Sequence, residues 1–280
     1  MLRGVAVIVL LLANLLLWGT PVVVVGVVKF AVQMTAPRSR LRTRVILLLA
    51  SLAERWVGGN DRIFDWLLPT EWDIAGIGEE VRPSGHYLII SNHVSWVDIF
   101  VLFRAFHRRA AFIRFFLKHQ LIWFPIAGQG CWALEFPFMH RYSPEYLAKH
   151  PEKRGKDLAT TRRACQRYRN FPVAIANFVE GTRFTRAKRE QQQSPYRHLL
   201  RPRVGGVSFV LASLGALLDA TYDVTIAYPG EEATMWRFIS GKVGRVVVRT
   251  RRVEPPTPDG VKEWIYAVWQ EKDALLDSLA

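Results

Sequence analysis

Apolar residues fill the start of the chain and then recur in short, spaced groups. From Gly4 to Met34 the sequence is almost wholly apolar, and Arg3 and Lys29 are the only charged residues among the first 36. A run of this length is typical of a segment that enters a lipid bilayer. The pattern therefore predicts an N-terminal membrane-embedded helical segment.

The sequence Gly19-Thr20-Pro21 interrupts this apolar run, so a membrane could hold it in two ways. Pro21 lacks a backbone donor and restricts the residue before it. The piece before the interruption would form a helix of roughly 22 Å, which is shorter than the hydrocarbon core of about 30 Å. The segment then either spans the bilayer once with a kink or enters one leaflet as a re-entrant helical hairpin. A cleaved signal peptide is not expected, because no small-x-small cleavage site precedes a polar start.

Arginines at positions 38, 40, 42 and 44 follow the apolar run directly. Basic flanks of membrane segments stay on the cytoplasmic side, and anionic headgroups would contribute roughly 1 kcal/mol for each Arg near the surface. We therefore expect a membrane anchor with its basic flank at 1–44 and a single domain at 45–280. In a bacterium this domain would lie at the inner membrane and face the cytoplasm.

The rest of the chain alternates between strand-like and helix-like apolar patterns. Strands are predicted at 72–76, 86–90, 111–116, 171–179, 224–228 and 245–253. Helices are predicted at 45–57, from 95 onward, at 158–168, at 207–218 and at the C-terminal end, and the Gly58-Gly59 pair is expected to end the first of them. Alternation of this kind favours an α/β domain, with a mixed, mostly parallel sheet flanked by helices.

Composition narrows the compartment and the cofactor class. Half of the 280 residues are hydrophobic, which is enough for one large core. The two cysteines, Cys131 and Cys165, form neither a zinc pattern nor a disulfide framework, so a reducing compartment is expected and both should be ordinary buried thiols. No pair of Cys or His has metal-ligand spacing, and no protein-bound metal or other cofactor is expected.

The formal net charge of +14 suits a nucleic acid, an anionic lipid or a phosphorylated substrate. Charge alone does not choose among these partners. Its placement directly after a long apolar run favours a phospholipid membrane and predicts no nucleic-acid partner.

His93 and Asp98 lie five positions apart, directly after the strand predicted at 86–90. On one continuous helix they would diverge by about 140°. They can meet only if His93 lies in the loop and Asp98 in the first turn of the helix. A neutral imidazole held by a carboxylate is a proton acceptor near pH 7. The alternative is structural, because Ser95 and Asp98 also fit a capping box.

Three further segments carry polar groups next to apolar runs. Glu180-Gly181-Thr182-Arg183 follows a predicted strand, and such a turn can offer backbone N–H groups and a guanidinium to a phosphate. It could also be a surface turn with an ion pair of little energetic value. Arg141 ends the run 136–140, and Lys118 follows the strand at 111–116; alone, each is compatible with a solvated side chain.

Taken together, these segments resemble the glycerophospholipid acyltransferase family. The resemblance rests on N-H-x-S-x-x-D at 92–98, F-M-x-R at 138–141 and E-G-T-R at 180–183, and it covers roughly 87–229. Within this family, the sequence most resembles the subgroup of bacterial membrane-bound 1-acylglycerol-3-phosphate acyltransferases. The stretch 223–229 also supports this subgroup.

This resemblance implies a reaction and roles for the residues. The protein would transfer an acyl group from acyl-CoA or acyl carrier protein to a lysophospholipid, foremost lysophosphatidic acid, by direct attack without an acyl-enzyme. His93 would be the general base and Asp98 would steady its tautomer. The substrate-binding residues implied for the phosphorylated acceptor are Glu180, Gly181, Thr182, Arg183, Arg141 and Lys118.

Two positions depart from the family pattern. Glu135 stands where the second motif usually begins with Gly, and Thr225-Ile226-Ala227-Tyr228 replaces a run that usually contains Pro. Both departures concern the selectivity for the headgroup or acyl chain more than the reaction. The aromatic stretch from Trp123 to Phe138 could supply an apolar groove for the acyl chain, or it could be plain core.

Three other functions are alternatives to an acyltransferase. A serine hydrolase could use Ser95, but the sequence has no Gly-x-Ser-x-Gly elbow. A basic nucleic-acid-binding protein or nuclease would explain the charge but not the apolar N-terminus. A non-catalytic membrane-surface module would leave His93 and Asp98 with structural roles only.

Overall fold

The computed structural model describes residues 1–35, 39–140, 142, 144–153 and 156–279. A six-stranded sheet forms its centre, in the order β1-β8-β7-β2-β6-β3. The strands are β1 (Glu71–Ala75), β2 (His86–Ser91), β3 (Ile113–Phe115), β6 (Val173–Phe178), β7 (Ala220–Ala227) and β8 (Arg245–Val253). Only β7 and β8 pair antiparallel, while the other four pairs are parallel. The predicted mixed, mostly parallel sheet is confirmed.

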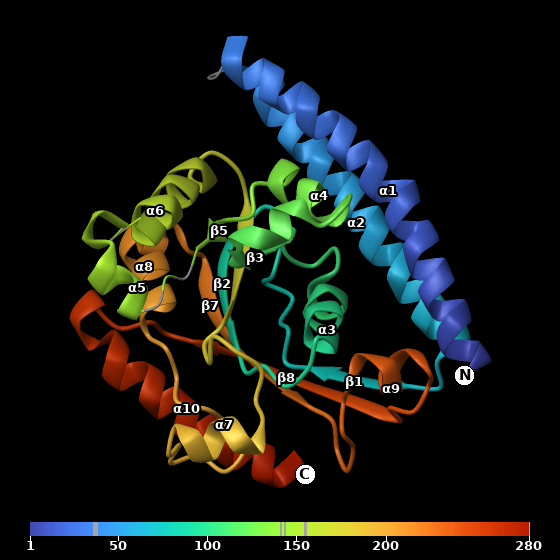
Figure 1. The fold of residues 1–280 in the computed structure, drawn as a ribbon, viewed down its shortest axis with the longest axis vertical. Coiled ribbons are helices and arrows are strands. Elements are labelled where there is room, and N and C mark those ends of the chain that lie inside the picture. Colours follow the sequence, from blue (N-terminus) through green and yellow to red (C-terminus); the bar gives the residue numbers. More distant parts are fainter. Residues whose placement is uncertain (36–38, 141, 143, 154–155, 280) are drawn as a thin grey trace.

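Helices cover both faces of this sheet (Figure 1). One face carries α3 (Val97–Phe106) and α4 (Ala127–Ala133), and the other carries α6 (Lys156–Tyr168), α8 (Gly205–Leu214) and α10 (Val261–Leu279). The short elements are the strands β4 (Leu117–Lys118) and β5 (Phe138–Met139), the 3-10 helix η1 (His119–Trp123), and the helices α5 (Pro144–Lys149), α7 (Arg186–Gln191) and α9 (Met235–Ile239). Each strand predicted from the sequence has a counterpart in the sheet.

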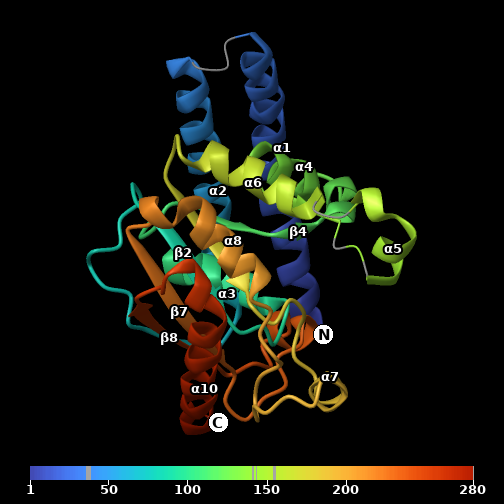
Figure 2. The ribbon, with the colours of Figure 1, turned by 90° about the vertical axis from the view of Figure 1, so that its left-hand side faces the viewer.

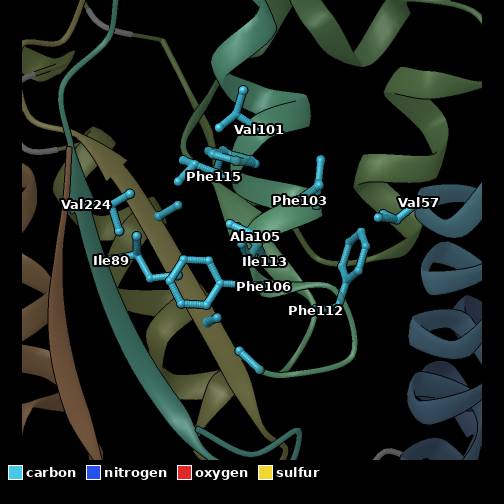
Figure 3. Close-up of a cluster of buried hydrophobic side chains, with 14 of the residues drawn as sticks. Val57, Ile89, Val101, Phe103, Ala105, Phe106, Phe112, Ile113, Phe115 and Val224 are labelled. Carbon is cyan, nitrogen blue, oxygen red and sulfur yellow. The ribbon is translucent and has the colours of Figure 1, made fainter. Parts of the chain in front are cut away.

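Side chains of β2 alternate between two hydrophobic cores. Tyr87 and Ile89 join the core beneath α3, whereas Leu88 and Ile90 join the core beneath α6, α8 and α10. Successive side chains of a strand point to opposite faces, so a strand covered on both faces is apolar throughout. Figure 3 shows the first of these cores, where Ile89 of the sheet approaches Phe106 of α3.

The N-terminal segment forms a long helical pair. Helix α1 (Leu2–Thr35) continues through Pro21, and α2 (Arg40–Leu67) runs back alongside it (Figures 1 and 2). Of the two arrangements expected for this segment, the structure has one continuous helix and not a hairpin that turns at 19–21. The expected end of the second helix at Gly58-Gly59 is wrong. Both chain breakers lie in packed helices: a side chain at Gly59 would collide with Asn14 of α1, so glycine permits the close approach.

Helix α1 is long and apolar enough to cross a membrane, as judged by its length and composition. It does not stand apart from the protein, however, because α2 and α4 pack along it. Leu12, Leu16 and Val27 of α1 are exposed at its outer face. The boundary expected at residue 44 falls inside α2, so the basic flank belongs to the helical pair.

Glu135 joins both N-terminal helices to the sheet domain. Its carboxylate lies 3.2 Å from Lys29 Nζ of α1, 3.3 Å from Arg42 of α2 and 2.5 Å from Arg167 of α6. Burial alone would raise the pKa of this carboxyl, but Lys29 and Arg167 hold it below its usual value. The backbone φ of +65° at Glu135 is one that glycine adopts more readily. The residue that departs from the family pattern, Glu135, therefore forms an ionic junction between the helical pair and the sheet domain.

Replacing Glu135 tests this junction. Glu135→Gln keeps the side-chain size but leaves buried cations without a counter-charge, so we expect a loss of roughly 3 kcal/mol in the free energy of unfolding. Glu254→Gln removes the exposed partner of Arg252 and should cost about 1 kcal/mol or less. Chemical denaturation of both variants measures the difference; equal losses would show that the junction contributes no more than a surface ion pair.

Candidate active site

The loop between β2 and α3 brings His93 and Asp98 together. His93 Nδ1 lies 2.8 Å from Asp98 Oδ2, and the Asp98 side chain is fully buried. The predicted geometry is confirmed, with His93 in the loop and Asp98 in the first turn of α3. A carboxylate at this distance fixes the tautomer, because Nδ1 must carry the proton and Nε2 keeps its lone pair.

Asp98 also organises the backbone of the loop. Its Oδ2 accepts hydrogen bonds from the N–H groups of Val94 at 2.7 Å and Ser95 at 2.9 Å. Ser95 Oγ in turn accepts from the N–H of Val97. The bond from the Ser95 N–H is the capping-box interaction that the sequence suggested. The two readings of Asp98 are thus compatible, because one carboxylate caps the helix and holds His93.

The His93 ring is packed between aromatic groups at the edge of a cavity. It stacks on Phe178 with the ring centroids 4.0 Å apart, and Trp96 meets it edge to face. The cavity has a volume of about 380 Å³. Its lining combines apolar side chains with polar ones, and the polar ones are His93, Lys118, Asn177, Thr182 and Arg183. An imidazole and two cations therefore face one open space.

Adjacent parallel strands place these groups at one edge of the sheet. His93 follows β2, the segment 180–183 follows β6, and Tyr228 follows β7, and these three strands are neighbours. Carboxyl ends of parallel strands are where α/β proteins bind ligands. The sheet order thus explains how residues far apart in the sequence share one site.

Glu180 is placed differently from the other residues of its segment. Its side chain is fully buried, with Oε1 accepting from the His93 N–H at 2.8 Å and Oε2 from the Leu200 N–H at 2.9 Å. The direct contact with a phosphate that the resemblance implied for Glu180 does not fit this geometry, because both oxygens are turned inward. Glu180 instead fixes the backbone of His93.

The rest of the turn faces the cavity. Gly181 has a φ of +68°, which suits glycine, and a side chain there would collide with Arg203. Arg183 is exposed, with its guanidinium 5.0 Å from the Trp96 ring centroid. Thr182 Oγ1 accepts a hydrogen bond from Lys188 Nζ at 2.8 Å. Lys118 is exposed and also lines the cavity, while Arg141 lies outside the described residues.

Sequence reasoning gave no individual role to three residues around the site. Lys188 of α7 bonds Thr182 and the carbonyl of Arg183. Asn92 donates to the Ile226 carbonyl and accepts from its N–H, both at 2.9 Å. Tyr228 donates to Asp98 Oδ1 at 2.6 Å. Asn92 was part of the recognised motif, but only the sheet order reveals that it faces β7.

An apolar cavity of about 190 Å³ adjoins the His93 cavity and shares Ile99, Phe115 and Leu117 with it. Residues from α1, α2 and α4 supply much of the rest of its lining. The stretch 123–138, from which an apolar groove was expected, therefore supplies only part of the lining of this cavity. Trp123 and Phe124 are 79% and 60% exposed and do not line it.

A larger cavity lies elsewhere. It measures about 700 Å³, lies between α1, α2 and the end of α3, and shares no lining residue with the His93 cavity. Its carboxylates, Glu54 and Asp61, are turned toward His107. Size alone therefore does not identify the chemical site, and the paired His93 and Asp98 do.

The cysteines play no part in this arrangement. Cys165 is buried as expected, Cys131 is only partly buried, and both are free thiols. Burial raises the pKa of Cys131 to about 12 and that of Cys165 to about 11, so neither is a thiolate at neutral pH. Among the described residues, no group of three or more His, Cys, Asp or Glu side chains could hold a metal ion.

Glu180 should make the stability of the protein depend on pH. Burial raises its pKa from 4.5 to about 8. When the pKa of a carboxyl is higher in the folded than in the unfolded state, the carboxyl contributes its full stabilisation at pH values below the unfolded-state pKa. This contribution is lost as the pH rises toward and through the folded-state pKa of about 8. Relative to Glu180→Gln, which does not titrate, the wild type should lose up to roughly 1.4 kcal/mol per pH unit between pH 5 and 8. Urea unfolding at several pH values measures this; a constant difference would contradict the raised pKa.

Comparisons with known proteins find that the sequence is similar to acyltransferases. Residues 74–229 match the family model described as Acyltransferase. The chain is 27% identical to 1-acyl-sn-glycerol-3-phosphate acyltransferase 3 of Arabidopsis thaliana, over 77% of this chain and 60% of that protein. It is 23% identical to the mouse (Mus musculus) 1-acyl-sn-glycerol-3-phosphate acyltransferase epsilon, over 71% of this chain and 59% of that protein. The chain thus spans about 60% of the length of these relatives.

A solved structure shares the fold. The crystal structure of the 1-acyl-sn-glycerophosphate acyltransferase PlsC of Thermotoga maritima superimposes with a TM-score of 0.53, covering 93% of this chain and 97% of that one. The sequence identity is 15%, so this likeness concerns the fold alone. The family model covers more than half of the chain, and the chain belongs to the Acyltransferase family.

Proposed function

We propose that this protein transfers a fatty acyl group from acyl-CoA or acyl carrier protein to the hydroxyl of a lysophospholipid. The acceptor that best fits the site is lysophosphatidic acid, with phosphatidic acid as the product. The observation that carries the proposal is the 2.8 Å contact between His93 Nδ1 and buried Asp98, at a cavity that also contains cationic side chains.

The proposed reaction needs one base and no covalent intermediate with the enzyme. His93 Nε2 accepts the proton of the acceptor hydroxyl while its oxygen attacks the thioester carbonyl carbon. The tetrahedral intermediate then expels the thiolate, which takes the proton from the imidazolium and leaves as a thiol. A positioned base contributes about 10²–10⁴ to such a rate. Asp98 steadies the positive charge that the ring carries between the two steps.

Positive side chains in the lining of the cavity suit the phosphate of the acceptor. Arg183 and Lys118 both line the cavity with His93, and Thr182 adds a hydroxyl to the same lining. A guanidinium matches the oxygens of a phosphate and forms charge-assisted hydrogen bonds with them. Arg141 stays a predicted contributor to this binding. We assign Glu180 to fixing the His93 backbone and not to the phosphate.

The adjoining apolar cavity suits a fatty acyl chain. It begins at Ile99 and Phe115 beside His93 and continues between α1 and α4. An acyl chain placed there would have its thioester near the imidazole. Neither cavity distinguishes CoA from acyl carrier protein as the group that delivers the chain, so the proposal retains both.

The helical pair would hold the site at a phospholipid membrane. The outer face of α1 exposes apolar side chains along its length, including Val5, Leu16 and Phe30. Apolar surface of this extent is unfavourable in water and favourable among acyl chains. Arg40 and Arg44 at the start of α2 are exposed and suit anionic headgroups. For a bacterial cell, we propose attachment to the inner membrane with the site toward the cytoplasm.

The rival functions have less support. Ser95 Oγ is buried and accepts from a backbone N–H, and Ser95 does not line the cavity, which disfavours a serine hydrolase. The cations near His93 lie beside an apolar cavity, and this combination suits a lipid better than a nucleic acid. A purely structural pair would not require the imidazole to border an open cavity.

Removing the imidazole tests the proposed base. His93→Ala should lower kcat at least about 100-fold, because no other group takes the proton. The half-exposed His150, paired with Glu152, provides the control His150→Ala, which should retain normal turnover. Product formation from lysophosphatidic acid and an acyl thioester is followed by mass spectrometry, with folding checked by circular dichroism. Near-normal turnover in folded His93→Ala would refute the assignment.

Replacing Arg183 tests the proposed phosphate contact. Arg183→Ala should raise KM for lysophosphatidic acid about 10-fold or more, the worth of a charge-assisted hydrogen bond, and leave KM for the acyl donor nearly unchanged. Arg186→Ala is the matched control, because Arg186 is also exposed and close in sequence but does not line the cavity. Steady-state kinetics with each substrate varied separately gives both constants. Equal changes for donor and acceptor would argue against the role.

A further inference from the structure

We propose that Tyr228 is a positioning residue of the acyl-transfer site, which makes the pair of His93 and Asp98 a hydrogen-bonded chain of three residues. Its phenol donates to Asp98 Oδ1 at 2.6 Å, on the side of the carboxylate away from the imidazole. The inference rests on the proposed function and adds a residue that sets the orientation and charge of the carboxylate.

The two oxygens of Asp98 have different environments. Oδ2 accepts from His93 and from two backbone N–H groups, whereas the phenol of Tyr228 is the donor to Oδ1. Asp98 is fully buried, so water does not take the place of a lost donor. A buried acceptor without a donor is costly. Tyr228 therefore completes the set of hydrogen bonds that a buried charge needs.

The phenol itself is held firmly in place. Tyr228 follows β7 directly, and Asn92 in the adjacent loop binds both backbone groups of Ile226, two residues earlier. The end of β7 and the His93 loop thus form one hydrogen-bonded unit. Burial, followed by the charge of Asp98, holds the pKa of the Tyr228 phenol well above its usual value near 10, so it remains a donor at the pH of catalysis.

This hydrogen bond should act on His93 in two ways. It prevents the carboxylate from rotating, which keeps Oδ2 aimed at Nδ1. It also shares the carboxylate charge with a second donor, which moderates the attraction of Asp98 for the imidazolium. Without the phenol, the ring would hold its proton more tightly, and the neutral base would appear only at higher pH.

The other charged or titratable groups near His93 are the same in the wild type and in Tyr228→Phe. Glu180 approaches from the end of β6, while Arg183 and Lys118 line the cavity. None of them contributes a hydrogen bond to Asp98 among those found in the described part of the chain. A change in the pH profile on altering Tyr228 therefore reports the bond to Asp98.

The chain contains a matched control for deleting this hydroxyl. Tyr222 lies in the same strand, is also buried, and donates its hydroxyl to Glu80 at 3.1 Å, away from the site. Tyr228→Phe and Tyr222→Phe each remove one oxygen without changing the ring. A structural role alone would lower the melting temperature of both variants and leave the chemistry of the folded enzyme unaltered.

The test is the pH dependence of kcat/KM for the wild type and both variants. We expect Tyr228→Phe to lower kcat about 10-fold and to move the acidic limb upward by roughly half a pH unit, while Tyr222→Phe changes neither. An unshifted limb with normal kcat in folded Tyr228→Phe overturns the inference, as does an equal effect in Tyr222→Phe. Failure of the proposed function itself would be recognised separately, because folded His93→Ala would then be as active as the wild type.

A second measurement covers the case in which Tyr228→Phe does not fold. Replacing Tyr228 by 3-fluorotyrosine keeps the ring and the donor but makes the phenol more acidic, so the bond to Asp98 strengthens. The acidic limb should then move downward, opposite to the shift from Tyr228→Phe. An unchanged or upward limb in the fluorinated protein contradicts the proposed role.

Discussion

One buried carboxylate organises the catalytic end of this protein. Asp98 accepts four hydrogen bonds, from the His93 ring, from the backbone at Val94 and Ser95, and from the Tyr228 phenol. A charge taken out of water is tolerated only when such donors surround it. The same contacts that make this burial possible also cap α3, shape the loop and orient the imidazole. Structure and the proposed chemistry therefore depend on one group.

A second ionic junction connects this end to the helical pair. Glu135 holds Lys29 of α1 and Arg42 of α2, and these helices form one wall of the apolar cavity through residues such as Trp18 and Trp56. The position of the N-terminal helices therefore shapes the cavity next to His93. This arrangement explains physically why the long apolar helix α1 is packed into the body of the domain and is not merely attached to it.

Local patterns predicted much of this architecture. The strands of the sheet and the amphipathic helices follow from periodicity. The spacing of His93 and Asp98 allowed their contact, and the resemblance to the acyltransferase family implied it. The sequence left open whether the chain continues as one helix through Pro21, because proline removes a backbone hydrogen bond and only the packing of α1 shows that the helix persists. Glu180 looked like a surface acid, and only the fold shows it bonded to the backbone of His93. Tyr228 is 130 residues from Asp98, so their contact depends on the sheet order.

The central claim is that His93 Nε2 takes the proton of a lipid hydroxyl while Asp98 holds the opposite nitrogen. The most direct measurement is a structure of the protein with bound lysophosphatidic acid and an unreactive thioester analogue. The account predicts the acceptor hydroxyl within about 2.6–3.2 Å of Nε2, its phosphate beside Arg183 and the acyl chain in the apolar cavity. A headgroup bound away from Arg183, with its hydroxyl out of reach of the imidazole, would contradict the account.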